Sequence, residues 1–464
     1  MLPDEILLEI FDCHRLAAQA NPSSLPWKWH RLAHVCQRWR FLVFASPRRL
    51  DLQLVYTFKS PVRKTLDFWP NLPIAISYPS RRLAPDDENN VVAALKHPER
   101  ICELHLIMAK TLWSKSDASM RAPFPALECL RLTSQDKIRP LALPEQFLDG
   151  SISQLRNIHL ASIAFPTLPM HLLTAKALVS LQLEEIPSAG YFTPEQFAGS
   201  LSVTTQLKTL KIHFLPPNSH ERSIDALPQS RVVLPALIEF EFKGNSEYVE
   251  DLVSRIDAPA LKQVNIVFFE QPTFGIPRLS RFISRTKELM RSLCHTSIQL
   301  SEDDITVICT SPDPASPTPG KLQLQVACEE LDRQLPLLIH ISRQLSDLLS
   351  GVDRFSIEAF SQLSSWLERE EMDSTQWLEL LRPFRNLKRF DVTGSLVQCI
   401  ASALEPVTGE MARIVLPALH DLYLIDSQTP ISIDPFIAAR QLYGRPVSVH
   451  YEREESPDRK GEDD

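Results

Sequence analysis

The sequence predicts an α/β fold in which a helical module at residues 1–50 precedes an irregular solenoid with a parallel sheet. Two observations carry this prediction. The first fifty residues contain two segments whose apolar residues recur at helical spacing. From residue 101 a strand-like hexamer recurs at intervals of 23 to 30 residues up to residue 261 and, after a gap, at intervals of 35 and 32 residues. A period in the twenties is typical of stacked repeats, because no single unit can bury its own apolar side. Residues 51–100 are then expected to connect the module to a repeat domain at 101–450.

The first helix of the module is expected at residues 2–11. Pro3 stands near the first turn, where its missing N–H is not needed, and Asp4 and Glu5 lie where the positive end of the helix dipole favours acidic side chains. The apolar residues that follow are expected to form one face of the helix: Ile6, Leu7, Ile10 and Phe11.

A second helix is expected where six apolar residues keep helical spacing with polar residues opposite: Leu32, Val35, Cys36, Trp39, Leu42 and Val43. Residues 21–26 read as a loop between the two helices. Two short amphipathic helices cannot bury this much apolar surface by themselves. We therefore expect a partner protein, or the rest of the chain, to cover it.

These segments resemble the F-box motif. The resemblance is carried by L-P-D-E-I-L-L-E-I-F at residues 2–11 and V-C-Q-R-W-R at residues 35–40, and the stretch 27–52 is further similar to F-box proteins common in fungi. The resemblance implies that the module binds a Skp-type adaptor and, through it, a cullin. The positions that match the motif are Leu2, Pro3, Ile6, Leu7, Ile10, Phe11, Val35, Cys36 and Trp39. The alternative reading is that these residues are ordinary core.

The repeated hexamer has the order apolar, two variable residues, apolar, one polar residue, apolar. It begins at residues 101, 127, 155, 178, 207, 237 and 261, and after a gap at 352, 387 and 419. Pro-Ala-Leu introduces four of the hexamers, and the residue between the last two apolar positions is hydrophilic nearly every time. This alternation predicts a strand with one buried face. The array resembles an irregular leucine-rich-repeat solenoid of the kind found behind F-boxes.

The interposed polar residues are the candidates for substrate binding, because alternation sends them to the face opposite the leucines, which is concave in such solenoids. Their mixed charge favours a protein surface over a phosphate backbone as the ligand. Plain solvated strand positions remain the alternative for each of them. The candidates are His105, Arg131, His159, Gln182, Lys211, Glu241, Asn265, Asp391 and Tyr423.

Several further elements are expected from local patterns. Strands are predicted at 50–54, 72–76, 305–309 and 322–326, and helices at 281–293 and 335–349, the last four within an irregular insertion at about 273–351. A proline-rich segment at 310–320 predicts a flexible loop. The charged tail at 451–464 is expected to be disordered.

Composition excludes several classes of function. The net charge of −8 does not favour bulk binding to nucleic acid or anionic membrane. The eight cysteines form no C-x-x-C pair, and neither a phosphate-binding glycine motif nor G-x-S-x-G is present. His30 and His34 have helical ligand spacing but lack the H-E-x-x-H pattern. We expect no cofactor, no metal and no catalytic residue, and a soluble protein of the cytoplasm or nucleus.

The function expected from these observations is that of a substrate-recognition subunit of a Skp–cullin–F-box ubiquitin ligase, with no enzymatic activity of its own. A second interpretation is an F-box scaffold that acts outside any ligase. A third is a hydrolase built on the insertion at about 273–351. The third interpretation requires a tight polar pocket that contains a nucleophile linked to a base.

Overall fold

The computed structural model describes residues 2–19, 29–47, 49–69, 71–80, 82–136, 140–143, 147–150, 153–164, 175–216, 231–311, 319–359, 374–425 and 433–452. The chain divides into two compact units, Met1–Tyr191 and Phe192–Asp464. Three predicted segments lie outside the described residues: the loop at 21–26, most of the proline-rich loop at 310–320, and the tail from residue 453.

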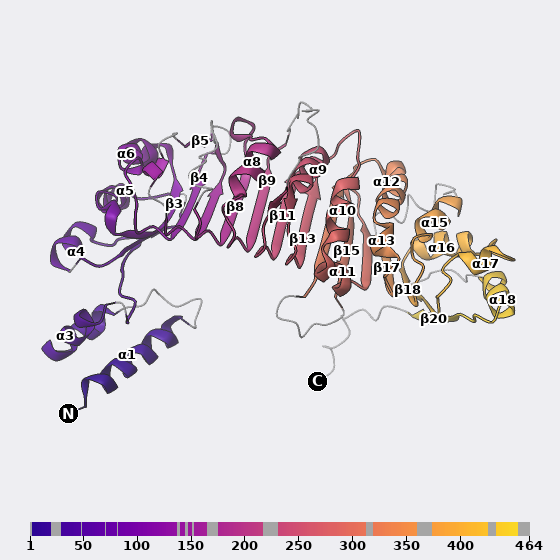
Figure 1. The fold of residues 1–464 in the computed structure, drawn as a ribbon, viewed down its shortest axis with the longest axis horizontal. Helices are drawn as coiled ribbons and strands as arrows, with labels where there is room; N and C mark the ends of the chain where they lie inside the picture. The colour runs from indigo at the N-terminus through magenta and orange to yellow at the C-terminus, as the bar shows by residue number, and fades with distance from the viewer. Residues whose placement is uncertain are drawn as a thin grey trace, which may run out of the picture. The chain divides into compact units, whose positions relative to one another are not determined.

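Unit 1 contains an N-terminal group of helices followed by parallel strands (Figure 1). Its helices are α1 (Asp4–Gln19), α2 (His30–Ala33), α3 (Gln37–Ala45), α4 (Val62–Phe68), α5 (Pro85–Ala94) and α6 (Lys110–Met120), with 3-10 turns η1 (Pro98–Arg100), η2 (Phe147–Gly150) and η3 (Ser188–Gly190). Its strands are β1 (Leu54–Tyr56), β2 (Ile74–Tyr78), β3 (Ile101–Met108), β4 (Cys129–Ser134), β5 (Leu141–Ala142), β6 (Asn157–Ala161), β7 (Ile163–Ala164) and β8 (Ser180–Ile186). The strand order is β1-β2-β3-β4-β6-β8, and every neighbouring pair is parallel.

Unit 2 alternates strands with helices (Figure 1). Its helices are α8 (Pro194–Leu201), α9 (Ser246–Arg255), α10 (Pro277–Arg285), α11 (Lys287–Ser292), α12 (Leu331–Gln344), α13 (Ser346–Leu349), α15 (Ser374–Leu381), α16 (Leu396–Leu404), α17 (Met411–Ile414) and α18 (Asp434–Leu442). Its strands are β9 (Thr209–Phe214), β10 (Val232–Val233), β11 (Glu239–Gly244), β12 (Ile256–Asp257), β13 (Gln263–Phe268), β14 (His295–Leu300), β15 (Asp304–Thr310), β16 (Lys321–Ala327), β17 (Arg354–Ala359), β18 (Arg389–Thr393), β19 (Asp421–Ile425) and β20 (Ser448–Glu452).

The main sheet of unit 2 is parallel except at one strand. The order is β9-β11-β13-β16-β15-β14-β17-β18-β19-β20, and β15 runs antiparallel to both of its neighbours. Helices α9, α12 and α16 pack against β11, β15 and β18. The chain is therefore a mixed α/β protein with extensive parallel strand pairing, as the sequence predicts.

All ten hexamers form strands, and their apolar residues form buried ladders. In unit 2, for example, Phe240 pairs with Leu210 on one side and Val264 on the other, and all three side chains are buried. Strand side chains alternate between the two faces of a sheet, so this register stacks apolar residues over apolar residues. The alternation in the sequence therefore correctly predicted both the strands and their buried side.

Several predicted elements differ from the structure. Residues 50–53 form no strand, and β1 begins only at Leu54. The helix expected at 281–293 is the pair α10 and α11, because Thr286 leaves the helical conformation with φ −82° and ψ 85°. The expected tail at 451–464 begins inside β20, which pairs with β19. Strand β14 was not predicted.

Two further features bear on function. Among the described helices, none combines the length and the apolarity that crossing a lipid bilayer requires. Within the described residues, no group of three or more histidine, cysteine, aspartate or glutamate side chains could hold a metal ion.

Candidate functional site

Helix α1 divides its apolar residues between two sides. Leu7 and Phe11 are buried, whereas Ile6 and Ile10 are 46% and 45% exposed and Leu2, just before the helix, is 51% exposed. The expectation of one common apolar face is wrong, because each pair spaced by four residues forms its own stripe, and successive residues are rotated by about 100°. Helix α1 therefore presents an outer row of Leu2, Ile6 and Ile10.

The inner stripe of α1 packs against α3. The rings of Phe11 and Trp39 meet edge to face, with their centroids 4.9 Å apart. Arg38 Nε donates to Asp4 Oδ1 at 2.9 Å, and Arg49 Nε donates to Asp12 Oδ2 at 2.9 Å. Arg38 in α3 and Arg49 in the turn after α3 thus hold α1 at its first turn and near its middle. This packing keeps the outer row turned away from α3.

The second helical segment is interrupted, so the prediction of one helix from Leu32 to Val43 is wrong. The break follows α2, and Cys36 adopts an extended conformation with φ −159° and ψ 170°. Its Sγ accepts a hydrogen bond from the backbone N–H of Trp39 at 3.4 Å and caps α3. A cap residue must leave the helical conformation, so Cys36 starts a new helix there. Val35, beside the break, is 58% exposed.

The helical module is joined to the connecting segment through Trp29, which the sequence analysis did not single out. Trp29 is buried, and its Nε1 donates to the carbonyl of Gln53 at 2.7 Å. Its ring meets those of Trp69 and Phe44, with centroids 5.1 Å and 5.8 Å away. His34, one of the two histidines with ligand spacing, packs edge to face on Trp69.

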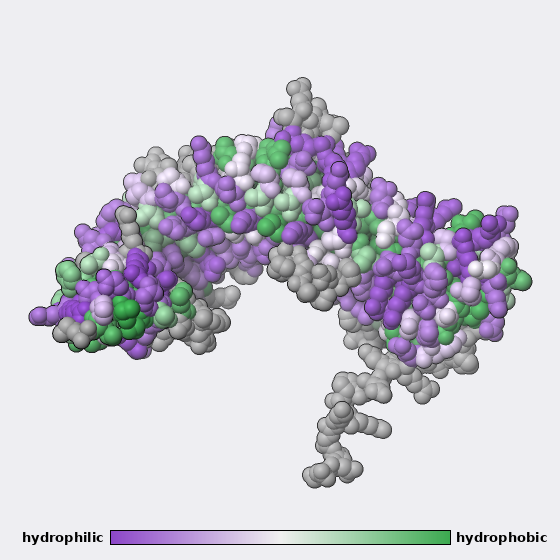
Figure 2. Space-filling model, turned by 60° about the horizontal axis from the view of Figure 1, so that its bottom comes forward, coloured by the Kyte–Doolittle hydropathy of each residue, from purple (hydrophilic) through white to green (hydrophobic). Residues whose placement is uncertain are grey.

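The nine residues that match the F-box motif fall into three groups. Trp39 is half-buried, Leu7 and Phe11 are buried within the helical module, and the other six are exposed: Leu2, Pro3, Ile6, Ile10, Val35 and Cys36. Figure 2 shows apolar side chains, in green, exposed at the N-terminal end of the chain. Large exposed side chains on a pre-packed pair of helices are typical of an interaction surface.

In unit 1 the polar candidates lie side by side on neighbouring strands. Register pairs them in one row, which begins with a serine that the sequence analysis missed: Ser77, His105, Arg131, His159 and Gln182. Arg131 is exposed and the others are half-buried. Burial lowers the pKa of His105, and the nearby Arg131 and His159 lower it further. His159 Nε2 lies 3.5 Å from a carboxylate oxygen of Glu184.

In unit 2 an equivalent row crosses all ten main strands. It contains every remaining candidate together with residues that the sequence analysis did not propose for binding: Lys211, Glu241, Asn265, Gln323, Ile308, Ser297, Ser356, Asp391, Tyr423 and His450. Gln323, Ile308 and Ser297 belong to strands of the insertion. Their place in the row could not be read from the hexamer, since β14 to β16 do not follow its period.

The first part of this row is a compact charged cluster. Lys211 Nζ lies 3.2 Å from Glu239 and 2.9 Å from Glu241, and His213 Nε2 lies 3.1 Å from Glu241. The interaction with His213 lowers the pKa of Glu241 to about 2; burial opposes this shift and Lys211 reinforces it. Burial lowers the pKa of Lys211, but Glu241 and Glu239 outweigh it and the net shift is upward.

We expect Glu241→Gln to destabilise unit 2 at neutral pH by about 1–2 kcal/mol, because the variant loses the carboxylate that Lys211 and His213 stabilise. The pKa shift by itself corresponds to a larger free energy of unfolding, but solvent screening of this half-exposed group reduces it. The pKa of Glu241 is depressed from 4.5 to about 2, so its carboxylate stabilises the fold above pH 4.5 and this contribution is lost as the pH falls toward 2. Urea unfolding at several pH values would measure the difference between variant and wild type. That difference should shrink in acid, whereas Glu410→Gln, at an exposed position, should show none at any pH. A difference that persists at pH 2 would contradict the assignment.

In the last part of the row, two arginine side chains hold an aspartate. Asp391 is only 5% exposed, because Arg354 Nε and Arg389 Nε donate to its two oxygens at 3.1 Å and 2.7 Å. The Arg389 guanidinium also lies 3.7 Å above the Tyr423 ring, and His450 stacks on Tyr423 with centroids 4.4 Å apart. Asp391 therefore serves to position Arg389, and the accessible groups here are arginine and aromatic rings, which are common at protein interfaces.

The insertion at about 273–351 and the residues 270–272 just before it line a pocket of about 280 Å³, to which Cys328, His340 and Glu270 contribute. The geometry does not link a base to the nucleophile. Cys328 Sγ donates to the carbonyl of Glu330 at 3.4 Å, and the His340 ring contacts the side chain of Gln344 at 2.7 Å. Burial raises the pKa of Cys328, so its thiol remains protonated and weakly nucleophilic. These contacts count against a hydrolase at this pocket.

The sequence matches no model of a known protein family, and no curated protein sequence matches it.

Proposed function

We propose that this chain is an F-box adaptor: its N-terminal helices dock on a Skp-type adaptor protein, and the polar rows of its leucine-rich-repeat-like strands bind a protein client. In this proposal the chain contributes no catalytic group. It raises the effective concentration of the client near a ubiquitin-transferring enzyme, and a cullin connects that enzyme to the adaptor.

The observation that carries the proposal is the outer row of Leu2, Ile6 and Ile10, each close to half exposed. Exposing three large apolar residues in line costs free energy unless a partner covers them. The contact between Phe11 and Trp39 and the ion pair between Arg38 and Asp4 hold this row in place before any partner arrives. Pre-organisation lowers the entropy cost of binding.

The polar rows of the two units support the client-binding half of the proposal. They contain side chains of both charges, and many of these side chains are half-exposed. Several are already held by neighbours, as Lys211 is by Glu241. A surface with mixed charges and aromatic rings suits another protein better than a nucleic-acid backbone. We infer that the client presents complementary charges along several strands.

The docking half is tested with Ile6→Asp/Ile10→Asp in the full chain and a purified Skp-type adaptor. Buried apolar anchors contribute about 2 kcal/mol each at interfaces, so we expect the double variant to bind at least about 100-fold more weakly. These residues are better targets than Trp39, because Trp39 packs on Phe11 and its loss would disturb the module itself. Surface plasmon resonance would measure the dissociation constant.

The matched control is Leu442→Asp, which charges an 86% exposed apolar residue far along the sequence in α18. Its affinity for the adaptor should equal that of the wild type. Unchanged binding by Ile6→Asp/Ile10→Asp would overturn the docking assignment. Co-purification of a cullin with the wild-type complex separates a ligase subunit from a scaffold that binds the adaptor alone.

A further inference from the structure

Helix α10 in unit 2 carries a basic face. Leu279, Phe282 and Ile283 are buried and set the rotation of the helix. Another side of the helix carries Arg278, Arg281 and Arg285 at i, i+3 and i+7, so the three guanidinium groups follow one line along the helix. This face lies outside the polar row and plays no part in the function proposed above.

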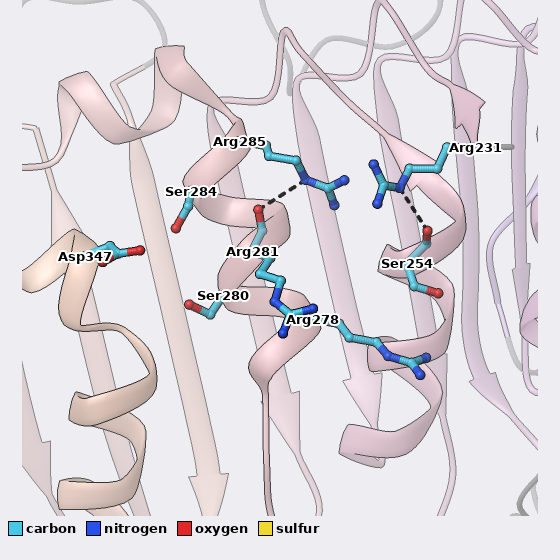
Figure 3. Close-up of a pocket in the computed structure, with 8 residues that line it drawn as sticks. All are labelled: Arg231, Ser254, Arg278, Ser280, Arg281, Ser284, Arg285 and Asp347. Carbon is cyan, nitrogen blue, oxygen red and sulfur yellow. Dashed lines mark hydrogen bonds between the residues drawn. The ribbon is translucent and has the colours of Figure 1, made fainter. Parts of the chain in front are cut away.

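The basic face borders a pocket of about 440 Å³ (Figure 3). Arg231, which precedes β10, faces Arg285 across the pocket, and Arg281 and Arg278 line it lower down. Ser254, Ser280 and Ser284 contribute neutral lining, and Asp347 is the one acidic residue among the lining side chains of the described chain. The lining therefore carries a net positive charge within a protein whose net charge is −8.

Most of these guanidinium groups have donors to spare. Arg231 Nε donates to the carbonyl of Ser254 at 3.1 Å, and Arg285 Nε donates to that of Arg281 at 3.2 Å. Among the described residues, Arg278 alone of the four makes an ion pair, with Asp251 at 3.7 Å. A guanidinium has five N–H donors, so each of these side chains can still bind an anion.

Gathering these arginines costs electrostatic free energy. Burial lowers the pKa of Arg285, and the nearby charge of Arg231 lowers it further; Asp257 opposes this shift, and Arg281 adds a smaller lowering effect. The repulsion is present in the ligand-free protein. An anion in the pocket would relieve it.

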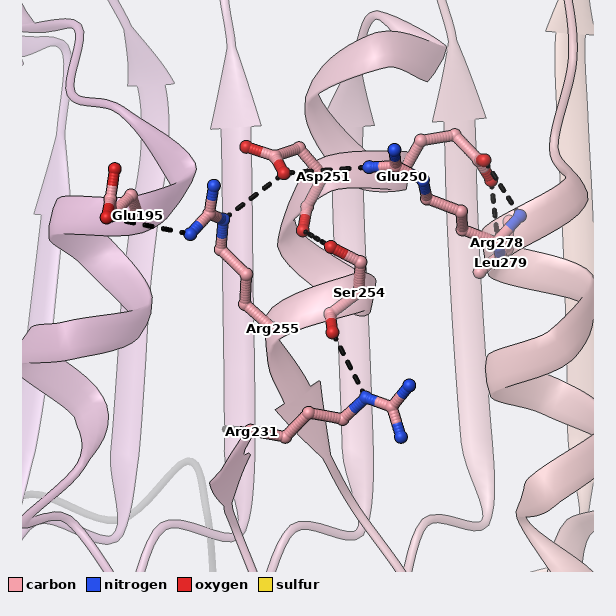
Figure 4. Close-up of polar contacts among 8 residues, drawn as sticks. All are labelled: Glu195, Arg231, Glu250, Asp251, Ser254, Arg255, Arg278 and Leu279. Atoms are coloured by element: carbon pink, nitrogen blue, oxygen red, sulfur yellow. Dashed lines mark hydrogen bonds and ion pairs between the residues drawn. The ribbon is translucent and has the colours of Figure 1, made fainter. Parts of the chain in front are cut away.

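Hydrogen bonds and ion pairs between α9 and α10 hold the residues around the pocket in place (Figure 4). The buried carboxylate of Glu250 in α9 accepts hydrogen bonds from the backbone N–H groups of Arg278 and Leu279 at 2.8 Å and 2.7 Å, and so ties the start of α10 to α9. Asp251, the next residue, holds Arg255 at 3.2 Å as well as Arg278. These contacts hold the basic face in position without a ligand.

We propose that this pocket binds a compact polyphosphate, a small anion with two or more phosphoryl groups close together. Guanidinium groups match phosphate oxygens in charge and in forked geometry, and four of them exceed what one phosphate group engages. The volume is that of a small-molecule site, and a single phosphate ion would leave most of it to water.

The lining also indicates what the ligand lacks. None of the described residues that line the pocket is aromatic, so among them a nucleobase would find no ring to stack on. The hydroxyls of Ser280 and Ser254 already donate to the backbone carbonyls of Gln344 and Asp251 at 2.6 Å and 2.7 Å. Recognition therefore rests on the arginines and on charge, which favours closely spaced phosphoryl groups over a sugar or base.

Tripolyphosphate is the probe, compared with pyrophosphate, orthophosphate and sulfate at constant ionic strength, by isothermal titration calorimetry on the full chain. We expect affinity to rise at least about tenfold from orthophosphate to tripolyphosphate, because each added phosphoryl group engages further charged donors. Tripolyphosphate should also raise the melting temperature of the protein. Equal affinity for all four anions would overturn the proposal.

Two variants and a control test the site. Arg281→Glu and Arg285→Glu should each weaken tripolyphosphate binding at least about tenfold. Both side chains are exposed, and circular dichroism would confirm that the fold is kept. Arg291→Glu reverses an exposed arginine of α11 outside the pocket and should change nothing. Unaltered binding by both pocket variants would contradict the assignment, as would tighter binding of a doubly phosphorylated peptide than of tripolyphosphate, which would indicate a protein ligand instead.

Discussion

Replacing Phe355 by alanine is expected to destabilise unit 2 by about 4 kcal/mol, the middle of the range for buried phenylalanine. Phe355 lies in β17, fully buried, with its ring stacked between two others. The centroid of Phe384 is 4.3 Å away and that of Phe390 is 4.9 Å away. Alanine would remove both stacking contacts and leave a cavity that neighbouring strands, held by their ladders, cannot close. Chemical denaturation followed by circular dichroism would measure the loss.

Two comparisons make this prediction specific. Phe355→Leu keeps most of the volume and should cost about 1–1.5 kcal/mol. Leu442→Ala, at an 86% exposed position, should stay within about 0.5 kcal/mol of the wild type. If Phe355→Ala cost no more than Phe355→Leu, the tightly packed aromatic stack would be contradicted.

Replacing Arg440 by alanine is expected to cost about 3 kcal/mol, since unsatisfied buried acceptors cost about 1 kcal/mol or more each. The Arg440 side chain is 1% exposed, and its terminal nitrogens donate to the carbonyls of Ala412, Pro417 and Leu419 at 3.2 Å, 3.4 Å and 3.0 Å. One guanidinium thus joins α18 to α17 and to the segment that follows it. Removing the buried Arg440 guanidinium also removes its desolvation cost, which offsets part of the lost stability.

The control for Arg440 is Arg445, which is exposed and donates to the same Pro417 carbonyl at 3.1 Å. Arg445→Ala should cost less than about 1 kcal/mol, because water can replace its bond. Hydrogen exchange should show faster opening of residues 411–425 in Arg440→Ala than in Arg445→Ala. Similar exchange in both variants would argue against a structural role for the buried guanidinium.

The hexamers illustrate what local pattern can predict. Each strand places two apolar residues on the buried side and one polar residue between them, as Phe240, Glu241 and Phe242 do. A period of two specifies which side is buried, and similar spacing between hexamers brings equivalent residues into register. Strand positions, buried faces and parallel pairing could therefore be predicted without coordinates.

The insertion illustrates where pattern fails. Strand β14 alternates Thr296, Ile298 and Leu300 toward the core, yet it pairs with β17 and β15, not with the preceding β13. The chain passes over two strand positions and fills them afterwards with β15 and β16, running back toward β13. Strand order depends on which edges are free when each strand docks, and alternation alone does not encode it.

The sequence by itself determined the helical N-terminal segments, the ten strands and the polar identity of the row, because these follow from periods of 3.6 and 2 along the chain. Only the tertiary structure decided which stripe of α1 stays exposed, that Asp391 lies beneath two arginines, and that Arg231 meets the basic face of α10. The reason is physical: these arrangements arise from contacts between residues far apart in the chain, and their free energy depends on packing and charge that no local window contains.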